Sequence, residues 1–151
     1  MFYTQAESEL AAKLFPVAEG QTREVVGGGV DIAQAADPAR FRRKYGLNEP
    51  FVLYAGRREA GKNTPLLMDY WRRYWLESGC ERGVKLVLVG PGDITIPPDA
   101  AEGIIDLGFV SADDKTDAYA AASVFCMPSV HESFSIVLME SWLVGTPILV
   151  H

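Results

Sequence analysis

Basic side chains in the loop at residues 56–63 could bind a phosphorylated ligand. The loop follows the apolar run at residues 51–55 and carries Arg57 and Lys62. Arginine offers a planar fork of donors and lysine a flexible point charge, so together they could neutralise a pyrophosphate both when it binds and when it leaves. Taken alone, the loop is more typical of a solvated basic turn.

Two glutamates lie in and before a predicted helix further along the chain. Glu132 follows the apolar run at residues 124–127, and a carboxylate, which only accepts hydrogen bonds, suits the hydroxyl groups of a sugar. Ser133 or Ser135 could cap the helix, whose first-turn N–H groups and dipole favour an anion. Glu140 lies inside the helix among apolar neighbours, where ribose hydroxyls would supply the hydrogen-bond partners that its carboxylate needs.

Each glutamate also has a plainer interpretation. Glu132 could be a solvated loop residue or a partner of the helix dipole, and Glu140 could be an exposed charge on the helix face. The two glutamates stand eight positions apart. Eight helical rises span about 12 Å, whereas the carboxyl pair of a retaining glycosidase is about 5 Å apart. The spacing therefore argues against a glycosidase.

Metal and cofactor chemistry is not indicated by the sequence. It has no Asp-x-Asp pair and no cluster of His and Cys residues, so we expect neither a metal site nor a cofactor. His131 is more typical of a structural loop residue than of a base. Gly27-Gly28-Gly29 does not follow a strand and open a helix within the spacing of a dinucleotide fingerprint. Gly90-Pro91-Gly92-Asp93 lacks the Lys-Ser/Thr of a phosphate loop, so both segments predict turns.

Alternating strands and helices must position these residues. Apolar runs predict the strands and 3.6-residue periodicity predicts the helices. The alternation indicates an α/β class, a Rossmann-like parallel sheet with flanking helices, in which ligands bind outside the carboxyl ends of the strands. The predicted strands are residues 51–55, 85–89, 104–107, 124–127 and 147–150, and the predicted helices are residues 64–78, 113–122 and 134–144, preceded by a helix at 7–15 and a strand at 24–26.

Composition excludes several functional classes. The net charge of −6 and the pI near 4.9 argue against a nucleic-acid binder, which needs a basic stripe. No apolar run approaches the roughly 20 residues of a membrane span, so we expect no transmembrane segment. The start of the chain lacks the pattern of a secretory signal, and Cys80 and Cys126 form no C-x-x-C pair. We therefore expect buried, reduced thiols and a cytoplasmic protein.

Five motifs, in this order along the chain, resemble the donor-binding domain of retaining GT-B glycosyltransferases of family 4. The most specific is residues 128–147, with Pro-Ser, two glutamates separated by seven residues, and Gly-Thr-Pro before a strand. The others are residues 28–31, which resemble the interdomain stretch, residues 53–57 with Lys62-Asn63, which resemble the diphosphate loop, and residues 87–92 and 107–110. The resemblance runs from about residue 24 to residue 151.

The resemblance implies a binding site for a nucleotide-diphosphate sugar and a retaining, metal-independent transfer of the sugar. Arg57 and Lys62 would neutralise the diphosphate and stabilise the leaving group, which is electrostatic catalysis. Glu132 would hold hydroxyls of the transferred sugar and Glu140 those of the ribose. Where the family often has glycines, this chain has Ser133 and Ser135, which narrow the space for the sugar. Further substrate-binding positions implied by the resemblance are Gly56, Phe109, Val110, Ser133, Phe134, Ser135, Ile136 and Val137.

The resemblance also implies a division of the chain and a missing partner. Residues 1–31 would be an interdomain leading segment, and residues 32–151 a partial nucleotide-sugar-binding domain, the C-terminal half of a GT-B fold. An N-terminal Rossmann domain of the same protein would supply the acceptor site, so we expect this piece alone to be inactive. Two alternatives stay open: a sugar-nucleotide epimerase with a related fold, and a non-catalytic nucleotide-binding module. A response-regulator-like domain would need a clustered acidic pocket, which the sequence lacks.

Overall fold

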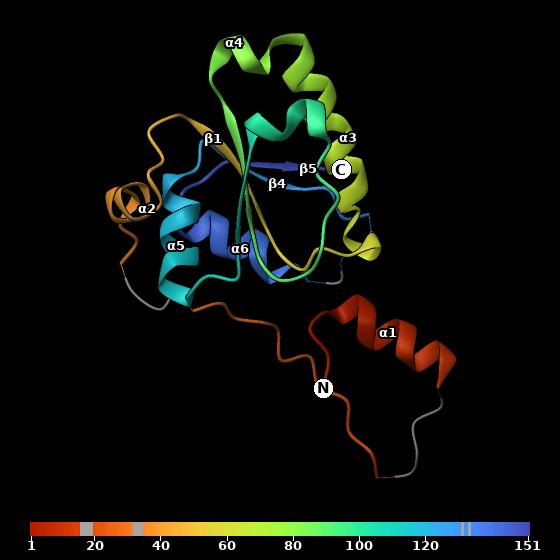
Figure 1. The fold of residues 1–151 in the computed structure, drawn as a ribbon. Coiled ribbons are helices and arrows are strands. Elements are labelled where there is room, and N and C mark those ends of the chain that lie inside the picture. The colour runs from red at the N-terminus through yellow and green to blue at the C-terminus, as the bar shows by residue number, and fades with distance from the viewer. Residues whose placement is uncertain (16–19, 32–34, 131, 133) are drawn as a thin grey trace. The chain divides into compact units, whose positions relative to one another are not determined.

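In the computed structural model the chain forms two units, Met1–Val30 and Asp31–His151 (Figure 1). The structure describes residues 1–15, 20–31, 35–130, 132 and 134–151. Ser133 and His131, which the sequence analysis singled out, lie outside the described residues. Among the described residues, no helix is long and apolar enough to cross a membrane.

The first unit is built around one helix, α1 (Gln5–Leu14). The helix begins two residues earlier than predicted because Thr4 and Glu7 form a capping box, in which each side chain accepts a hydrogen bond from the backbone N–H of the other residue. The strand predicted at residues 24–26 is reduced to a single parallel bridge between Phe2 and Val25. Among the described residues of this unit, the predicted strand therefore forms a single bridge and does not extend into a ladder of several pairs.

The second unit contains the predicted parallel sheet. Its strands are β1 (Phe51–Ala55), β2 (Lys85–Val89), β3 (Ile104–Gly108), β4 (Val124–Met127) and β5 (Ile148–Val150), and their order in the sheet is β3-β2-β1-β4-β5. Every pairing is parallel, and the central strand β1 places Leu53 beside Val87 on one side and Phe125 on the other. This arrangement confirms the Rossmann-like α/β prediction.

Helices cover both faces of the sheet, so successive residues of β1 point into different cores (Figure 1). Leu53 packs with Phe41 and Tyr119 on the face that carries α2 (Pro38–Tyr45), α5 (Ala112–Ala121) and α6 (Ile136–Leu143). Tyr54 packs with Trp71 on the face of α3 (Thr64–Tyr74), which continues through a π-turn, Trp75–Gly79, into α4 (Cys80–Arg82). Short 3-10 turns complete the unit at η1 (Ala60–Lys62) and η3 (Pro98–Gly103).

Several element boundaries differ from the prediction. The regular α-helix predicted to reach residue 78 ends at Tyr74, because the π-turn takes over the last turn. Helix α6 begins at Ile136, two residues late, because Ser135 adopts a left-handed conformation with φ of 38°. Helix α2 was not predicted, since it buries only Phe41 within a charged run, although Asp37, Pro38 and Gly46 are standard helix boundary residues.

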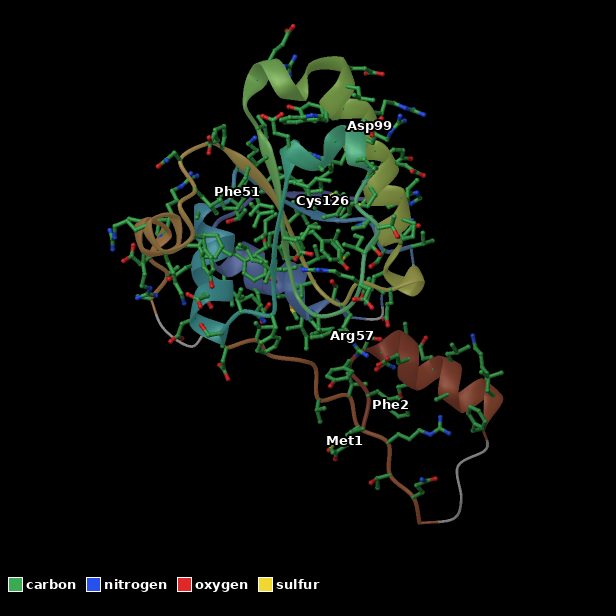
Figure 2. All side chains as sticks on the ribbon, in the orientation of Figure 1. Met1, Phe2, Phe51, Arg57, Asp99 and Cys126 are labelled. Atoms are coloured by element: carbon green, nitrogen blue, oxygen red, sulfur yellow. The ribbon has the colours of Figure 1, made fainter. Side chains whose placement is uncertain are left out.

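The prediction of a buried, reduced thiol is confirmed for Cys126. Cys126 lies in β4, is 8% exposed and carries a free thiol, and burial raises the pKa of that thiol to about 11. Figure 2 shows it inside the unit. The side chain of Cys80 lies outside the described residues.

Candidate nucleotide-binding site

A pocket of about 170 Å³ lies at the carboxyl ends of β1 and β2. It brings together five of the residues predicted to bind a ligand, which come from two loops and one helix: Gly56, Arg57, Phe109, Val110 and Val137. The remaining lining residues are Ala55, Val89, Gly90, Pro91 and Lys115. This is the edge at which a parallel α/β sheet binds its ligands.

Two close backbone approaches shape the floor of this pocket. The N–H of Gly56 donates to the carbonyl of Val89 at 2.9 Å, and the N–H of Gly90 donates to the carbonyl of Gly108 at 2.7 Å. A Cβ atom on Gly90 would lie 2.1 Å from the oxygen of Gly56, and Gly90 has φ of 125°. Only glycine fits at position 90, so the ends of β1, β2 and β3 can meet here.

A partly buried ion pair, which the sequence analysis missed, fixes the loops around the pocket. The guanidinium of Arg58 is 4% exposed and donates two hydrogen bonds of 2.5 Å to the carboxylate of Asp106. Asp106 also accepts from the N–H of Gly108 at 2.9 Å, and the N–H of Arg58 donates to the carbonyl of Pro91 at 2.9 Å. The signal in the sequence was a single aspartate within the otherwise apolar strand at residues 104–107.

The structure pairs Lys62 with Glu132, two predicted site residues far apart in the sequence. The ammonium of Lys62 lies 2.7 Å from Oε1 of Glu132, and the two side chains are 33% and 21% exposed. Partial burial acts to raise the pKa of Glu132, but hydrogen bonds from Lys62 and Ser129 outweigh it and hold that pKa below its usual range. Glu132 is therefore an ionised, acceptor-only group at neutral pH.

Arg57 has an exposed side chain and lines the 170 Å³ pocket (Figure 2). Its carbonyl accepts a hydrogen bond of 2.6 Å from the hydroxyl of Tyr54, which fixes the backbone at the start of the loop. At the other end of the loop, Asn63 donates to the carbonyl of Pro128 at 3.1 Å. The loop that carries Arg57 and Lys62 is thus anchored at both ends.

Glu140 is buried, so its interpretation as an exposed helix charge is wrong. It is 8% exposed. Its Oε1 accepts from the ammonium of Lys115 at 2.7 Å and its Oε2 accepts from the hydroxyl of Tyr119 at 3.0 Å. Burial, followed by the charge of Glu140, raises the pKa of Tyr119, so its hydroxyl stays a donor. Sequence reasoning missed both partners; their i, i+4 spacing on a predicted helix was the available signal.

The predicted side-chain cap of α6 is wrong for Ser135. Its hydroxyl accepts no capping hydrogen bond from the helix backbone and donates instead to the sulfur of Met127 at 3.0 Å. The left-handed backbone of Ser135 turns the chain into the helix. Val137, in the first turn, lines the pocket, Phe134 is partly buried and Ile136 is 52% exposed. The first-turn N–H groups still have no acceptor four residues back within the helix itself.

A larger pocket of about 410 Å³ lies elsewhere, over α3 and the loop after β2. It is lined by Arg58, Glu59 and Asp93 among others, and contains none of the predicted site residues. In the part of the chain that the structure describes, no three His, Cys, Asp or Glu side chains gather as a metal-binding group. The smaller pocket is therefore the one that gathers five of the predicted residues, whereas Lys62, Glu132 and Glu140 do not line it.

Comparison with known families identifies the chain. A family model described as glycosyl transferases group 1 matches residues 49–151, which include every element of the sheet and the pocket. The chain belongs to the group 1 glycosyl transferases. This confirms the resemblance to family 4 enzymes of the GT-B type.

Curated relatives of this family match most of the chain. Over 83% of this chain, it is 37% identical to a D-inositol 3-phosphate glycosyltransferase of Kribbella flavida. Over 95% of this chain, it is 30% identical to a phosphatidyl-myo-inositol mannosyltransferase of Mycobacterium leprae. An uncharacterised glycosyltransferase of Methanocaldococcus jannaschii is 32% identical over 73% of the chain. The chain spans 34%, 39% and 30% of the lengths of these three relatives, respectively.

Solved structures share the fold. Sucrose-phosphate synthase from Thermosynechococcus elongatus superposes over 99% of the chain with a TM-score of 0.71 and 25% identity, and the chain covers 39% of it. HepE of Anabaena, solved in complex with UDP-glucose, superposes over 99% with a TM-score of 0.70 and 22% identity, and the chain covers 43% of it. The fold shared with these glycosyltransferase structures therefore agrees with the family that the sequence match shows.

Proposed function

We propose that this chain binds a nucleotide-diphosphate sugar, the donor of a retaining, metal-independent glycosyl transfer. The observation that carries the proposal is the pocket of about 170 Å³ at the carboxyl edge of the sheet, bordered by Arg57, on the loop that also carries Lys62 with its ion pair to Glu132. Cations beside an exposed pocket suit a diphosphate, and an ionised carboxylate beside them suits the hydroxyls of a sugar.

In this proposal Arg57 and Lys62 hold the diphosphate and stabilise its charge as it leaves. Lys62 already touches Glu132, so a donor bound there would place its diphosphate and its sugar on adjacent side chains. Charge stabilisation of this kind is a large contributor to catalysis, and loss of one such contact in other enzymes costs about 2.7–4 kcal/mol.

The base of the nucleotide would lie against the turn at Phe109 and Val110. Phe109 is 83% exposed although it is a large apolar side chain, and it lines the pocket. An exposed aromatic ring beside a pocket is suited to stacking on a flat base. The titration of UDP, GDP and ADP described below identifies which base the site binds.

The complete reaction is proposed for a longer protein. Because the chain spans about a third of its curated relatives, we propose that an N-terminal Rossmann domain of the same protein carries the acceptor site. A cytosolic location and independence from metal and cofactor stay predictions. The family match supports the transferase over a sugar-nucleotide epimerase or a non-catalytic module.

Calorimetric titration of this chain with UDP, GDP and ADP tests the proposal. We expect one nucleotide to bind with a Kd between micromolar and millimolar, and the double variant Arg57→Ala, Lys62→Ala to lose this binding. The matched control is Arg43→Ala, Arg73→Ala, which removes two exposed cations of α2 and α3 and is expected to bind normally. Equal loss in both double variants would mean that net charge alone explains the binding.

A further inference from the structure

The ion pair of Arg58 and Asp106 joins the two segments that border the pocket. Arg58 follows Arg57 in the loop after β1, and its guanidinium donates to both oxygens of Asp106, in β3, at 2.5 Å. The Arg58 side chain is 4% exposed and that of Asp106 is 32% exposed. Neither Arg58 nor Asp106 lines the 170 Å³ pocket. Any effect of this pair on a bound nucleotide must therefore pass through the segments that it joins.

The strand that carries Asp106 is irregular at this point. In β3, Asp106 and Gly108 pair with successive residues of β2, so Leu107 is an extra residue between them. Bulges of this kind redirect the side chains around them and are frequent beside functional sites. The bulge lies immediately before the turn that borders the pocket.

Asp106 also fixes the turn that presents Phe109. Its Oδ1 accepts a hydrogen bond of 2.9 Å from the N–H of Gly108. Gly108 has φ of 63°, and a glycine imposes little conformational restriction of its own. The side chain of Phe109 is 83% exposed, so its direction depends on the backbone more than on packing.

The cationic side of the site has other anchors. The hydroxyl of Tyr54 donates to the carbonyl of Arg57, and the backbone N–H of Arg58 donates to the carbonyl of Pro91. Neither of these hydrogen bonds involves the side chain of Arg58. Loss of the ion pair is therefore expected to leave Arg57 in place and to release the turn that carries Phe109.

Stability alone does not account for an ion pair at this position. Taking charged groups out of water is costly, and apolar residues of similar volume in place of such a pair often give an equally stable protein. An arginine fork on a carboxylate provides a fixed geometry that apolar side chains do not. The pair is thus suited to orienting the backbone that it joins.

We propose that Arg58 is a positioning residue: through Asp106 it holds the turn that presents Phe109, and so sets how strongly the base contributes to nucleotide affinity. The inference rests on the proposed donor-binding function. It gives a role in that function to an ion pair that lies outside the proposed ligand contacts.

A second arginine–aspartate pair provides a matched control. Arg72, in α3, donates to both oxygens of Asp99, in η3. Their side chains are 50% and 42% exposed, and neither residue lines the 170 Å³ pocket. Replacing either pair by apolar residues removes one positive and one negative charge, so the net charge of the chain does not change.

The experiment is a double-mutant cycle with Phe109→Ala, measured by calorimetric titration of UDP, GDP and ADP. The backgrounds are wild type, the pair variant Arg58→Met, Asp106→Leu and the control variant Arg72→Met, Asp99→Leu. In wild type and in the control variant, we expect Phe109→Ala to weaken binding of the preferred nucleotide by about fivefold or more, the lower end of what stacking of one base contributes. In the pair variant, we expect Phe109→Ala to change the Kd by less than about twofold, which is within the scatter of such cycles.

The pair variant by itself has a defined expectation as well. Because Arg57 keeps its anchors, we expect this variant to bind the nucleotide about as well as Phe109→Ala does. Arg58→Lys serves if the pair variant fails to fold. Lysine keeps the charge but cannot donate through a planar fork, so we expect Phe109→Ala to have a smaller effect in Arg58→Lys than in wild type.

Four results would overturn the inference while leaving the proposed function intact. The first is an undiminished effect of Phe109→Ala in the pair variant, or in Arg58→Lys where that variant is used. The second is a pair variant that binds no nucleotide, since the ion pair would then be needed for the whole site. The others are an equal loss of the Phe109→Ala effect in the control variant, and a wild type in which Phe109→Ala has no effect. If wild type binds none of the nucleotides, the proposed function itself fails.

Discussion

The charged side chains Lys62, Glu132 and Glu140 each have a hydrogen-bonding partner within the protein before a ligand binds. Lys62 keeps Glu132 ionised, and Lys115 and Tyr119 orient Glu140, which would otherwise be a buried carboxylate without partners. A buried charge that loses a partner is destabilising, because the remaining charge stays away from water. The pairs therefore contribute to the stability of the unit as well as to the proposed ligand contacts.

The role of Tyr119 can be measured as stability. We expect Tyr119→Phe to lower the free energy of unfolding by about 1.5–3 kcal/mol, the range for a hydrogen bond to a charged group, because Oε2 of Glu140 then loses its donor. Urea denaturation followed by circular dichroism measures the change. Tyr70→Phe, which removes the hydroxyl from a side chain that is 54% exposed, is the control and should be nearly neutral. Equal losses in the free energy of unfolding for the two variants would argue against the buried hydrogen bond from Tyr119 to Glu140.

Residue types at the site were predictable from the sequence, but their partners were not. Arg57, Lys62, Glu132 and Glu140 follow from strand ends and from motif spacing. The pairing of Glu140 with Lys115 joins α5 to α6. The i, i+4 spacing of Lys115 and Tyr119 places both on one face of a helix, but no periodic pattern within that helix reports which neighbour the face packs against. The same limit applies to the ion pair of Arg58 and Asp106, which joins the loop after β1 to β3.

At the scale of elements, the site depends on how closely the strand ends approach one another. Gly90 allows the backbone after β2 to pass the oxygen of Gly56, and Asn63 ties the loop after β1 to the residue that follows β4. These contacts position the segments from which the pocket is built. The start of α6 shows where a local rule failed, because the backbone conformation of Ser135, rather than its hydroxyl, sets the helix boundary.

Gly90→Ala tests the close approach directly. We expect a loss of about 3 kcal/mol or more in the free energy of unfolding, because a Cβ atom would overlap the oxygen of Gly56 and φ of 125° is strained for alanine. Thermal and urea denaturation measure this loss. Gly61→Ala is the matched control, since a Cβ atom there meets nothing within 4 Å. A Gly90→Ala variant as stable as wild type would contradict the described approach of the strands.

For the molecule as a whole, the sheet was the most predictable feature. Its inner strands, β1, β2 and β4, are largely apolar because both of their faces are covered, and the crossover connections between the strands give parallel pairing. Helix α2 escaped prediction because it contributes one buried side chain, Phe41, from a run of charged residues. Alternation along the chain thus predicted the architecture, while the short, highly charged helix α2 needed its tertiary contacts to be recognised.

The most direct test of the account is a crystal structure of this chain with UDP, or with whichever of UDP, GDP and ADP binds in the titration. We predict that the nucleotide occupies the 170 Å³ pocket, with its base against Phe109 and its diphosphate oxygens within hydrogen-bonding distance of Arg57 and Lys62. A nucleotide in the 410 Å³ pocket over α3, or one that contacts neither cation, would contradict the proposed donor site.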